Sequence, residues 1–255
     1  MPNLTVGPTA CLILIGNEVL SGRTKDANLQ YLGTRLTELG IRMAEARVIP
    51  DIEAVIIESL NECRAKFDYV FTTGGIGPTH DDITSVCVAK AFGVALERNA
   101  EARALLMRNY TSATELTEAR LKMTEIPVGA TLVENPVSHA PGYRMGNVFV
   151  FAGIPRIMQA MFEGIVDILE GGAPTLSTAI TARIPEGILG GPLAAVQARF
   201  ADVEIGSYPF KKGNGIFGAS LILRSSDAAE LDQAADAVRR MIRDLGAEPL
   251  EGDMV

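Results

Sequence analysis

Residues 72–84 read TTGGIGPTHDDIT and bring glycines, two carboxylates and one of the chain's two histidines together. Gly74, Gly75 and Gly77 let the backbone turn with positive φ and approach a ligand closely. The polar residues that follow stand at the start of a predicted helix, where N-terminal N–H groups favour anions. This combination predicts a loop that binds a phosphate group.

The adjacent carboxylates of Asp81 and Asp82 would repel a bare phosphate. They are better explained by a divalent cation that bridges to the phosphate, and His80 beside them could bind the same ion or transfer protons. The predicted metal ligands are therefore His80, Asp81 and Asp82. The alternative is a glycine turn in which Asp82 caps the next helix and His80 is a hydrogen-bonded surface residue.

Two other phosphate-binding patterns are absent from the sequence. No lysine follows these glycines in the GxxxxGK[ST] spacing, and no GxGxxG follows the first predicted strand. A P-loop nucleotide-binding site and a dinucleotide-binding fingerprint are therefore excluded at these positions.

The elements around this loop alternate between strand and helix. Such alternation predicts an α/β fold with a doubly wound parallel sheet, which binds ligands at the carboxyl ends of its strands. Apolar spacing and capping residues define the segments. We expect strands at 10–15, 41–49, 69–72, 131–134 and 148–152, and helices after Asp26, after Asp51, at 83–93, over most of 99–123 and at 156–169.

The sequence EGGAP at 170–174 is the clearest break in composition. We expect a first domain at 1–172 and a smaller α+β domain at 173–255, with residues 248–255 as a loose tail. The spacing in the second part predicts a β-α-β-β-α order. Its expected segments are strand 177–184, helix 190–200, strand 203–207, strand 216–223 and helix 227–245.

The composition limits the partners. The 255 residues include 23 Lys and Arg against 31 Asp and Glu, a net charge of −8, which lacks the basic surface of nucleic-acid or membrane-surface binders. No run approaches the roughly 20 apolar residues of a membrane span. Cys11, Cys63 and Cys87 each lie in an apolar stretch, which predicts buried thiols. We expect a cytoplasmic protein with a small-molecule partner, a nucleotide or a pterin.

TTGGIGPTHDDIT closely resembles the signature of the molybdopterin-binding-like family shared by MogA, MoaB and the N-terminal domain of CinA. The resemblance covers about residues 8–170. It includes IGNEVLSG at 15–22, DAN at 26–28, Lys122-Met123 with Pro127, and the segment from Asn135 to Gly142. GSYP at 206–209 resembles the small domain that follows in CinA-type proteins, and the same pairing occurs in the hydrolase half of eukaryotic FAD synthase.

Two departures from the CinA pattern concern the candidate site. His80 stands where CinA usually has proline, and Ser138-His139 stand where it usually has Gly-Thr. The nicotinamide-nucleotide deamidase domain of CinA has no counterpart in these residues, so we expect no deamidase activity.

The resemblance implies a three-layer, mostly parallel sheet fold and assigns roles to individual residues. Asp82, Asp51 and Glu18 would be catalytic, although from the sequence alone Asp51 and Glu18 could equally cap local turns. Lys122 could meet a phosphate or be solvated, and His139 lies in a stiff loop that could face the site. The implied substrate-binding residues are Thr73, Gly74, Gly75, Gly77, Pro78, Thr79, Asn28, Lys122, Asn135, His139 and Gly142.

The resemblance also implies chemistry. CinA-type domains are similar to enzymes that cleave the pyrophosphate of ADP-ribose or FAD with a divalent metal and potassium, whereas MogA adenylates molybdopterin with ATP. We therefore expect metal-dependent hydrolysis of a nucleotide pyrophosphate that releases AMP, using cobalt, magnesium or manganese, with potassium as a further ion. A molybdopterin-binding or adenylating protein and a non-catalytic nucleotide-binding module are the alternatives. We expect a homo-oligomer, either a dimer or a trimer.

Overall fold

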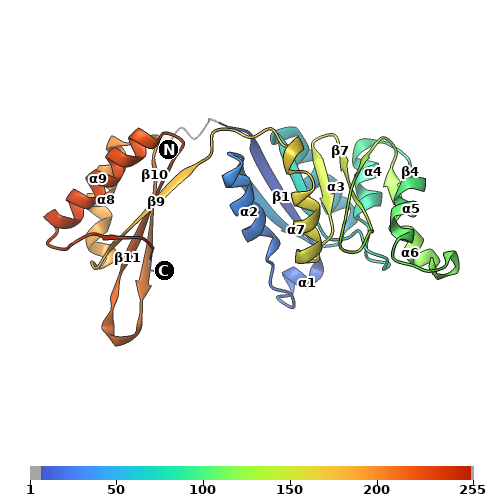
Figure 1. The fold of residues 1–255 in the computed structure, drawn as a ribbon, viewed down its shortest axis with the longest axis horizontal. Helices are drawn as coiled ribbons and strands as arrows, with labels where there is room; N and C mark the ends of the chain where they lie inside the picture. Colours follow the sequence, from blue (N-terminus) through green and yellow to red (C-terminus); the bar gives the residue numbers. More distant parts are fainter. Residues whose placement is uncertain (1–6, 254–255) are drawn as a thin grey trace. The chain divides into compact units, whose positions relative to one another are not determined.

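The computed structural model describes residues 7–253, except for the side chains of residues 113 and 214. The chain divides into two compact units, Pro8–Gly172 and the part that begins at Ala173, and each is described by itself (Figure 1). Among the described residues, no helix combines the length and apolar character needed to cross a membrane.

A six-stranded sheet forms the centre of the first unit, in the order β2-β1-β3-β8-β7-β6. The strands β2, β1, β3 and β8 are parallel to one another, whereas β7 and β6 are antiparallel to their neighbours. The sheet is therefore mostly parallel. Its strands are β1 (Thr9–Ile15), β2 (Arg42–Ile49), β3 (Tyr69–Thr73), β6 (Thr131–Val133), β7 (Gly142–Met145) and β8 (Val148–Phe151).

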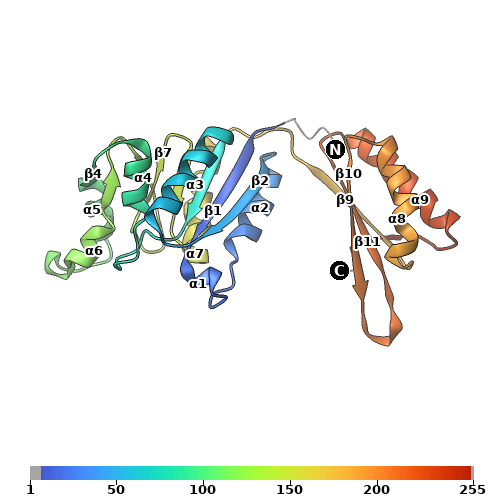
Figure 2. The ribbon, with the colours of Figure 1, turned by 180° about the vertical axis from the view of Figure 1, so that it is seen from behind.

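Helices cover both faces of this sheet, which gives three layers (Figures 1 and 2). Side chains alternate along β1: Leu12 and Leu14 pack with α2 and α7, whereas Cys11 and Ile13 pack with α3 and α4. Such two-sided burial explains why the strand is apolar throughout. The helices of this unit are α1 (Asn17–Leu20), α2 (Asn28–Glu38), α3 (Glu53–Lys66), α4 (Thr84–Phe92), α5 (Ala100–Met107), α6 (Glu118–Lys122) and α7 (Pro155–Glu163).

The predicted α/β fold is confirmed, but three short strands of the first unit were not predicted from the sequence. Besides β7, these are β4 (Leu96–Arg98) and β5 (Glu125–Pro127), which pair with each other in a separate two-stranded sheet. The helix expected at 156–169 also ends early. It stops before Gly164 and is followed by a 3-10 helix at Val166–Ile168.

The second unit is a four-stranded sheet in the order β10-β11-β9-β12, with α8 and α9 packed on one face (Figure 1). Its observed neighbours are all antiparallel. The expected β-α-β-β-α order is observed. Its elements are β9 (Leu176–Ala182), α8 (Glu186–Arg199), β10 (Glu204–Lys211), β11 (Phe217–Ser225), α9 (Ala228–Asp244) and β12 (Leu250–Glu251).

The loose tail expected at 248–255 is wrong for the part that the structure describes. Leu250 and Glu251 form β12 on the edge of β9. Arg239 of α9 donates two hydrogen bonds to the Glu251 carboxylate, at 2.8 and 3.0 Å. A bidentate ion pair and a strand ladder therefore hold this segment. Residues 254 and 255 lie outside the described residues.

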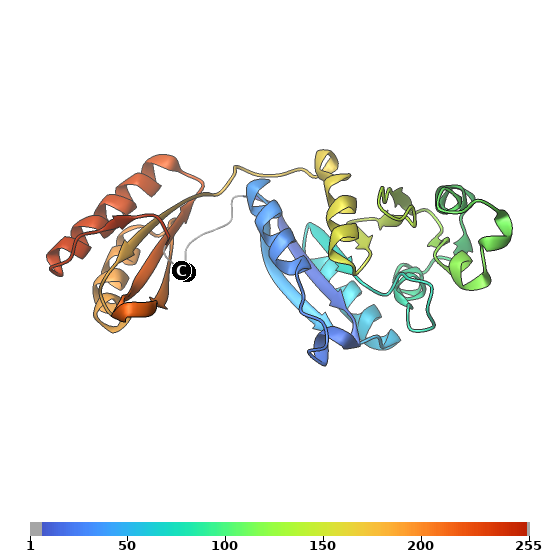
Figure 3. The same cartoon turned by 60° about the horizontal axis from the view of Figure 1, so that its bottom comes forward.

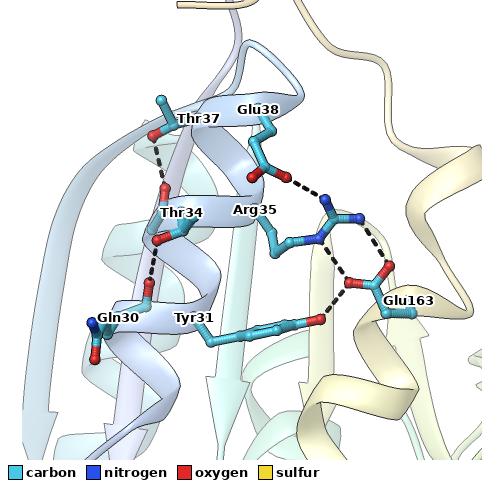
Figure 4. Close-up of polar contacts among 8 residues, drawn as sticks. Gln30, Tyr31, Thr34, Arg35, Thr37, Glu38 and Glu163 are labelled. Atoms are coloured by element: carbon cyan, nitrogen blue, oxygen red, sulfur yellow. Dashed lines mark hydrogen bonds and ion pairs between the residues drawn. The ribbon is translucent and has the colours of Figure 1, made fainter. Parts of the chain in front are cut away.

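A polar cluster ties α2 to α7 on one face of the first unit (Figure 4). Arg35 donates to both carboxylate oxygens of Glu163, at 2.8 and 2.9 Å, and also donates to Glu38. The Tyr31 hydroxyl donates to the same Glu163 carboxylate. Burial and this hydrogen bond raise the pKa of Tyr31 to about 12. The cluster joins two helices that are separated by more than a hundred residues in sequence.

The cluster predicts a pH dependence of stability. The hydrogen bonds from Arg35 hold the pKa of Glu163 below its ordinary value, so the folded state favours the ionised carboxylate. This contribution is present above the unfolded pKa of about 4.3 and is lost as the pH falls through the lower folded value. When the pH falls from about 5 to about 3, the melting temperature of Glu163→Gln should therefore drop less than that of the wild type.

Circular dichroism melts at low salt would measure the effect, because the half-exposed pair is screened at high salt. Glu58→Gln is the matched control, since Glu58 is exposed on α3 and makes no ion pair among the described residues. Equal acid sensitivity of Glu163→Gln and the wild type would contradict the prediction.

Candidate functional site

The parallel strands of the first unit deliver their loops to one edge of the sheet, beside α1 (Figure 3). Neighbouring loops are joined there by backbone hydrogen bonds. Gly16 N–H donates to the Ile49 carbonyl at 3.1 Å, and Gly74 N–H donates to the Phe151 carbonyl at 3.1 Å. Open α/β sheets bind ligands at this carboxyl edge.

The loop after β3 has a backbone conformation that requires glycine at Gly74 and Gly75. Gly74 and Gly75 have φ values of +101° and +69°. A Cβ on Gly74 would lie 2.2 Å from the Ile15 carbonyl oxygen, and one on Gly75 would lie 2.1 Å from Thr84 Oγ1. The Thr84 hydroxyl donates to the Gly74 carbonyl and its N–H donates to the Gly75 carbonyl, both at 3.0 Å. The start of α4 therefore holds the loop in place.

Asp81 and Asp82 converge on Thr79. The Thr79 hydroxyl lies 2.5 Å from Asp81 Oδ1 and 2.5 Å from Asp82 Oδ2, and its N–H donates to Asp82 at 2.8 Å. The hydroxyl has one proton, so it can donate to only one carboxylate at a time. Its hydrogen bond to Asp81 lowers the pKa of that carboxyl, so Asp81 is ionised at neutral pH. Two carboxylate groups thus meet at one point of the loop.

Asp82 does not cap the following helix. The helix α4 begins at Thr84, and no side chain caps its N-terminus. Instead Asp82 folds back towards Gly77, where a Cβ would lie 2.7 Å from Asp82 Oδ2. The helix-cap alternative considered for Asp82 is therefore wrong, and its carboxylate is directed to the loop.

His80 and Lys122 both lie next to this carboxylate pair. The His80 side chain is 97 % exposed, and its Nδ1 is 3.9 Å from Asp81 Oδ1. Lys122 donates through Nζ to the Thr79 carbonyl. Asp82 and Lys122 line one hollow. Its full lining is Ile76, Gly77, Asp82, Ser85, Val86, Leu96, Lys122 and Glu125.

A second hollow, shallow and open to solvent, lies on the β1 side of the loop and is lined by Glu18 and Asn28. Asn28 is 97 % buried: its Nδ2 donates to the Gly153 carbonyl at 2.9 Å, and its Oδ1 has no partner among the described residues. An unpaired buried amide oxygen is costly unless a ligand or water satisfies it. The remaining lining residues are Leu14, Ile15, Val19, Thr24, Lys25, Asp26, Ala27, Thr73, Gly153 and Pro155.

Asp51 makes a contact at the same edge but lines neither hollow. Its Oδ2 accepts the Asn17 N–H at 2.9 Å and so holds the loop after β1. The helix α3 begins at Glu53 with no side-chain cap, so the helix-cap alternative for Asp51 is also wrong. The catalytic role of Asp51 stays a prediction.

The loop between β6 and β7 also lies at this edge, because antiparallel β7 begins where β8 ends. Asn135 is buried and uses its amide within its own loop: Nδ2 donates to Ser138 Oγ and the Ala140 carbonyl. Gly142 is a sheet residue, where a Cβ would lie 2.3 Å from the Val150 carbonyl oxygen. His139 is half-buried with φ of +51°. Asn135 and Gly142 thus have contacts that shape the loop, and Pro78 is exposed.

Both units match models of known protein families. Residues 11–171 match the family model described as a probable molybdopterin-binding domain, and residues 174–250 match the model of the middle domain of FAD synthase. The first match covers more than half of the chain. The chain belongs to the molybdopterin-binding domain family.

The chain is also similar to individual archaeal proteins and to one solved structure. A protein of Pyrobaculum calidifontis is 43 % identical over 167 residues, which are 64 % of this chain and only 64 % of that relative. A protein of Aeropyrum pernix is 34 % identical over 262 residues and covers 96 % of this chain and 98 % of its own length. The crystal structure of CinA from Thermoplasma acidophilum, described as having unknown function, is 35 % identical with a TM-score of 0.60. The alignment with this CinA structure covers 64 % of this chain and 98 % of the CinA chain.

Several residues that line the two hollows of this molybdopterin-binding-type domain were not predicted from the sequence. Lys25 and Pro155 line the Glu18 hollow, and Ser85 and Glu125 line the Asp82 hollow. Position relative to the motifs could have found them, since Lys25 precedes the DAN segment and Ser85 follows DDIT. Their residue types alone carry no signal.

The glycine loop predicts a sharp difference between two substitutions. Gly74→Ala should destabilise the protein by about 3 kcal/mol or more, because positive-φ strain is added to a collision with the Ile15 carbonyl. Gly22→Ala, at φ of +72° with no atom within 4 Å of the new Cβ, should cost about 1 kcal/mol. Urea unfolding of the two variants measures both values, and equal losses would contradict the close approach.

Proposed function

We propose that this protein hydrolyses the pyrophosphate of a nucleotide such as ADP-ribose or FAD and releases AMP. The observation that carries the proposal is the glycine loop. Among the described residues, the N–H groups of Gly75, Ile76 and Gly77 donate to no protein acceptor, and Gly77 lies beside the Asp82 carboxylate. Backbone N–H groups left free in such a loop suit the oxygens of a phosphate.

The two hollows support a ligand with two arms. The Glu18 hollow includes Thr73 at the start of the loop, and the Asp82 hollow includes Gly77 further along it. A dinucleotide has two such arms joined by a pyrophosphate, which would lie on the loop between them. The match of residues 174–250 to the middle domain of FAD synthase supports including FAD among the candidate substrates.

The donor set fits a hard divalent cation. Magnesium and similar ions bind one or two carboxylates and complete their shell with water and substrate phosphates. Asp81 and Asp82, whose oxygens both approach Thr79 Oγ1, are the residues that would hold cobalt, magnesium or manganese, and His80 at the exposed rim is the proposed third ligand. Such a divalent ion would neutralise charge on the phosphate oxygens, and potassium is proposed as a second ion at the site.

The chain's own groups account for the remaining steps of the proposal. The free N–H groups of Gly75 to Gly77 would bind non-bridging oxygens, and Lys122, anchored on Thr79, would add positive charge nearby. Water attacks the phosphorus of the AMP moiety, the bridging P–O bond breaks, and the second phosphate leaves with its oxygen. Glu18, in the short helix α1 that follows β1, is the proposed base that accepts the proton of this water.

A pterin ligand is the second candidate, and the unpaired Oδ1 of Asn28 favours it. Asn28, whose Oδ1 is buried without a partner among the described residues, and Glu18 both line one hollow, together with the apolar Leu14 and Ile15. The amino-pyrimidinone ring of a pterin presents donors to such acceptors. In this reading the protein binds or adenylates molybdopterin, and ATP-dependent adenylation of molybdopterin without release of AMP from dinucleotides would favour it.

Asp82→Asn should abolish AMP release and keep the melting temperature within a few degrees. The amide keeps an oxygen for the Thr79 donors but loses the charge that the metal requires. Chromatography of AMP from ADP-ribose, FAD and NAD, with each metal and with potassium, measures the effect. Asp167→Asn is the control, because Asp167 is exposed and lines neither hollow.

Full turnover in Asp82→Asn would reject Asp82 as the essential carboxylate. No AMP from the wild type under any metal, with nucleotide binding still seen by calorimetry, would reject hydrolysis and favour a non-catalytic nucleotide-binding module.

A further inference from the structure

Two of the three cysteines meet inside the first unit, on the side of the sheet covered by α3. Cys11 of β1 and Cys63 of α3 are fully buried, and their Sγ atoms are 3.4 Å apart. They are 52 positions apart in the sequence. The third cysteine, Cys87 on α4, is buried in the same core. The fold has therefore created a thiol pair that sequence spacing does not reveal.

The surroundings of the pair distinguish its two sulfurs. Cys11 donates its S–H to Cys63. This hydrogen bond, helped by the nearby Arg47 guanidinium, lowers the pKa of Cys63. The same hydrogen bond and burial raise the pKa of Cys11. Cys87 differs, because burial raises the pKa of its thiol to about 11. Thiolate character thus concentrates on Cys63.

Glu45 completes a cluster that could be read as a metal site, since its carboxylate and the two sulfurs lie within 4.8 Å of one another. Its oxygens, however, already accept from Arg47 at 2.6 Å and from Lys66 at 2.8 Å. A divalent cation would have to displace or face these two positive charges. The positive charges of Arg47 and Lys66 favour a thiolate and disfavour a bound metal ion. Oxidation of the two thiols therefore explains the cluster better than metal coordination.

We propose that Cys11 and Cys63 are a reversible oxidation site that forms a disulfide between β1 and α3. The Sγ atoms must approach from 3.4 Å to about 2.0 Å. Both cysteines are fully buried, so a small oxidant would need a local opening of the structure. The partly exposed Glu45 side chain, whose carboxylate lies within 4.8 Å of both sulfurs, marks the side on which such an opening would admit it.

A hydroperoxide supplies the chemistry with balanced atoms and electrons. The Cys63 thiolate attacks the peroxide, the S–O bond forms as the O–O bond breaks, and the leaving alkoxide or hydroxide takes up a proton. The sulfur of Cys11 then attacks Cys63, the S–S bond forms, and the departing hydroxide takes the Cys11 proton as water. Two thiols are oxidised by two electrons and one peroxide is reduced.

The link would join two elements that lead to the candidate site. The strand β1 continues into the loop of Asn17, and α3 follows Asp51, whose carboxylate binds the Asn17 N–H. A disulfide between the two elements therefore constrains the unfolded chain and raises the melting temperature. This inference does not rest on the proposed function.

The test treats protein purified under reducing conditions with hydrogen peroxide, then denatures it and titrates thiols with a maleimide. The count should fall from the three cysteines of the sequence to one, with a mass loss of two hydrogens, a linked peptide pair containing Cys11 and Cys63, and recovery with dithiothreitol. Cys87→Ala should form the same link. Cys63→Ala should keep both remaining thiols.

Three results would overturn the proposal. All thiols could remain after peroxide, Cys63 could gain oxygen without a linked peptide, or zinc retained by the purified protein could protect Cys11 and Cys63. The peptide map of the wild type decides among them even where a variant folds poorly.

Discussion

The close approach of Gly74 to the backbone around it is the constraint on which the site depends. Its N–H donates to the end of β8, and its Cα hydrogen faces the Ile15 carbonyl at the end of β1. Gly153 lies against it, since a Cβ there would be 3.3 Å from the Gly74 Cα. No side chain can separate these three strand ends. The chain therefore leaves β3 as a bare backbone loop, in which the N–H groups of Gly75 to Gly77 donate to no acceptor among the described residues.

Much of the fold could be predicted because its main signals are local. Helical spacing of apolar residues indicates helices, and a continuous apolar run indicates a strand that is buried on both faces. The strand β1 confirms this, because its alternate residues pack into two different cores. The strands β4, β5 and β7 were missed because three or four residues carry almost no periodicity. Their strand character comes from pairing with distant partners, as for Gly142, which lies under the Val150 carbonyl. Non-local pairing of this kind has no local signature.

The sequence predicts which polar residues reach the carboxyl edge of the sheet, but it does not separate the roles of those residues. Asp51, Asn135 and Asp82 all follow strands or loops at one edge, so their sequence contexts look alike. All three accept backbone N–H groups nearby, but they differ in their other partners. Asp82 also shares the Thr79 hydroxyl with the Asp81 carboxylate, whereas no second carboxylate meets Asp51 or Asn135 among the described contacts. A carboxylate that shares its partner keeps acceptor capacity for a cation or a ligand.

The same strand geometry links the site and the buried thiols. Ile15 ends β1 beside the Glu18 hollow, while Cys11, four residues earlier, faces α3. A strand places residues at even separations on one face, so the direction of Cys11 follows from that of Ile15. The sequence does not predict how α3 packs on the sheet, and this packing is what places Cys63 next to Cys11. Chemistry at the strand ends is therefore set by the backbone, and chemistry within the core is set by how the helices pack.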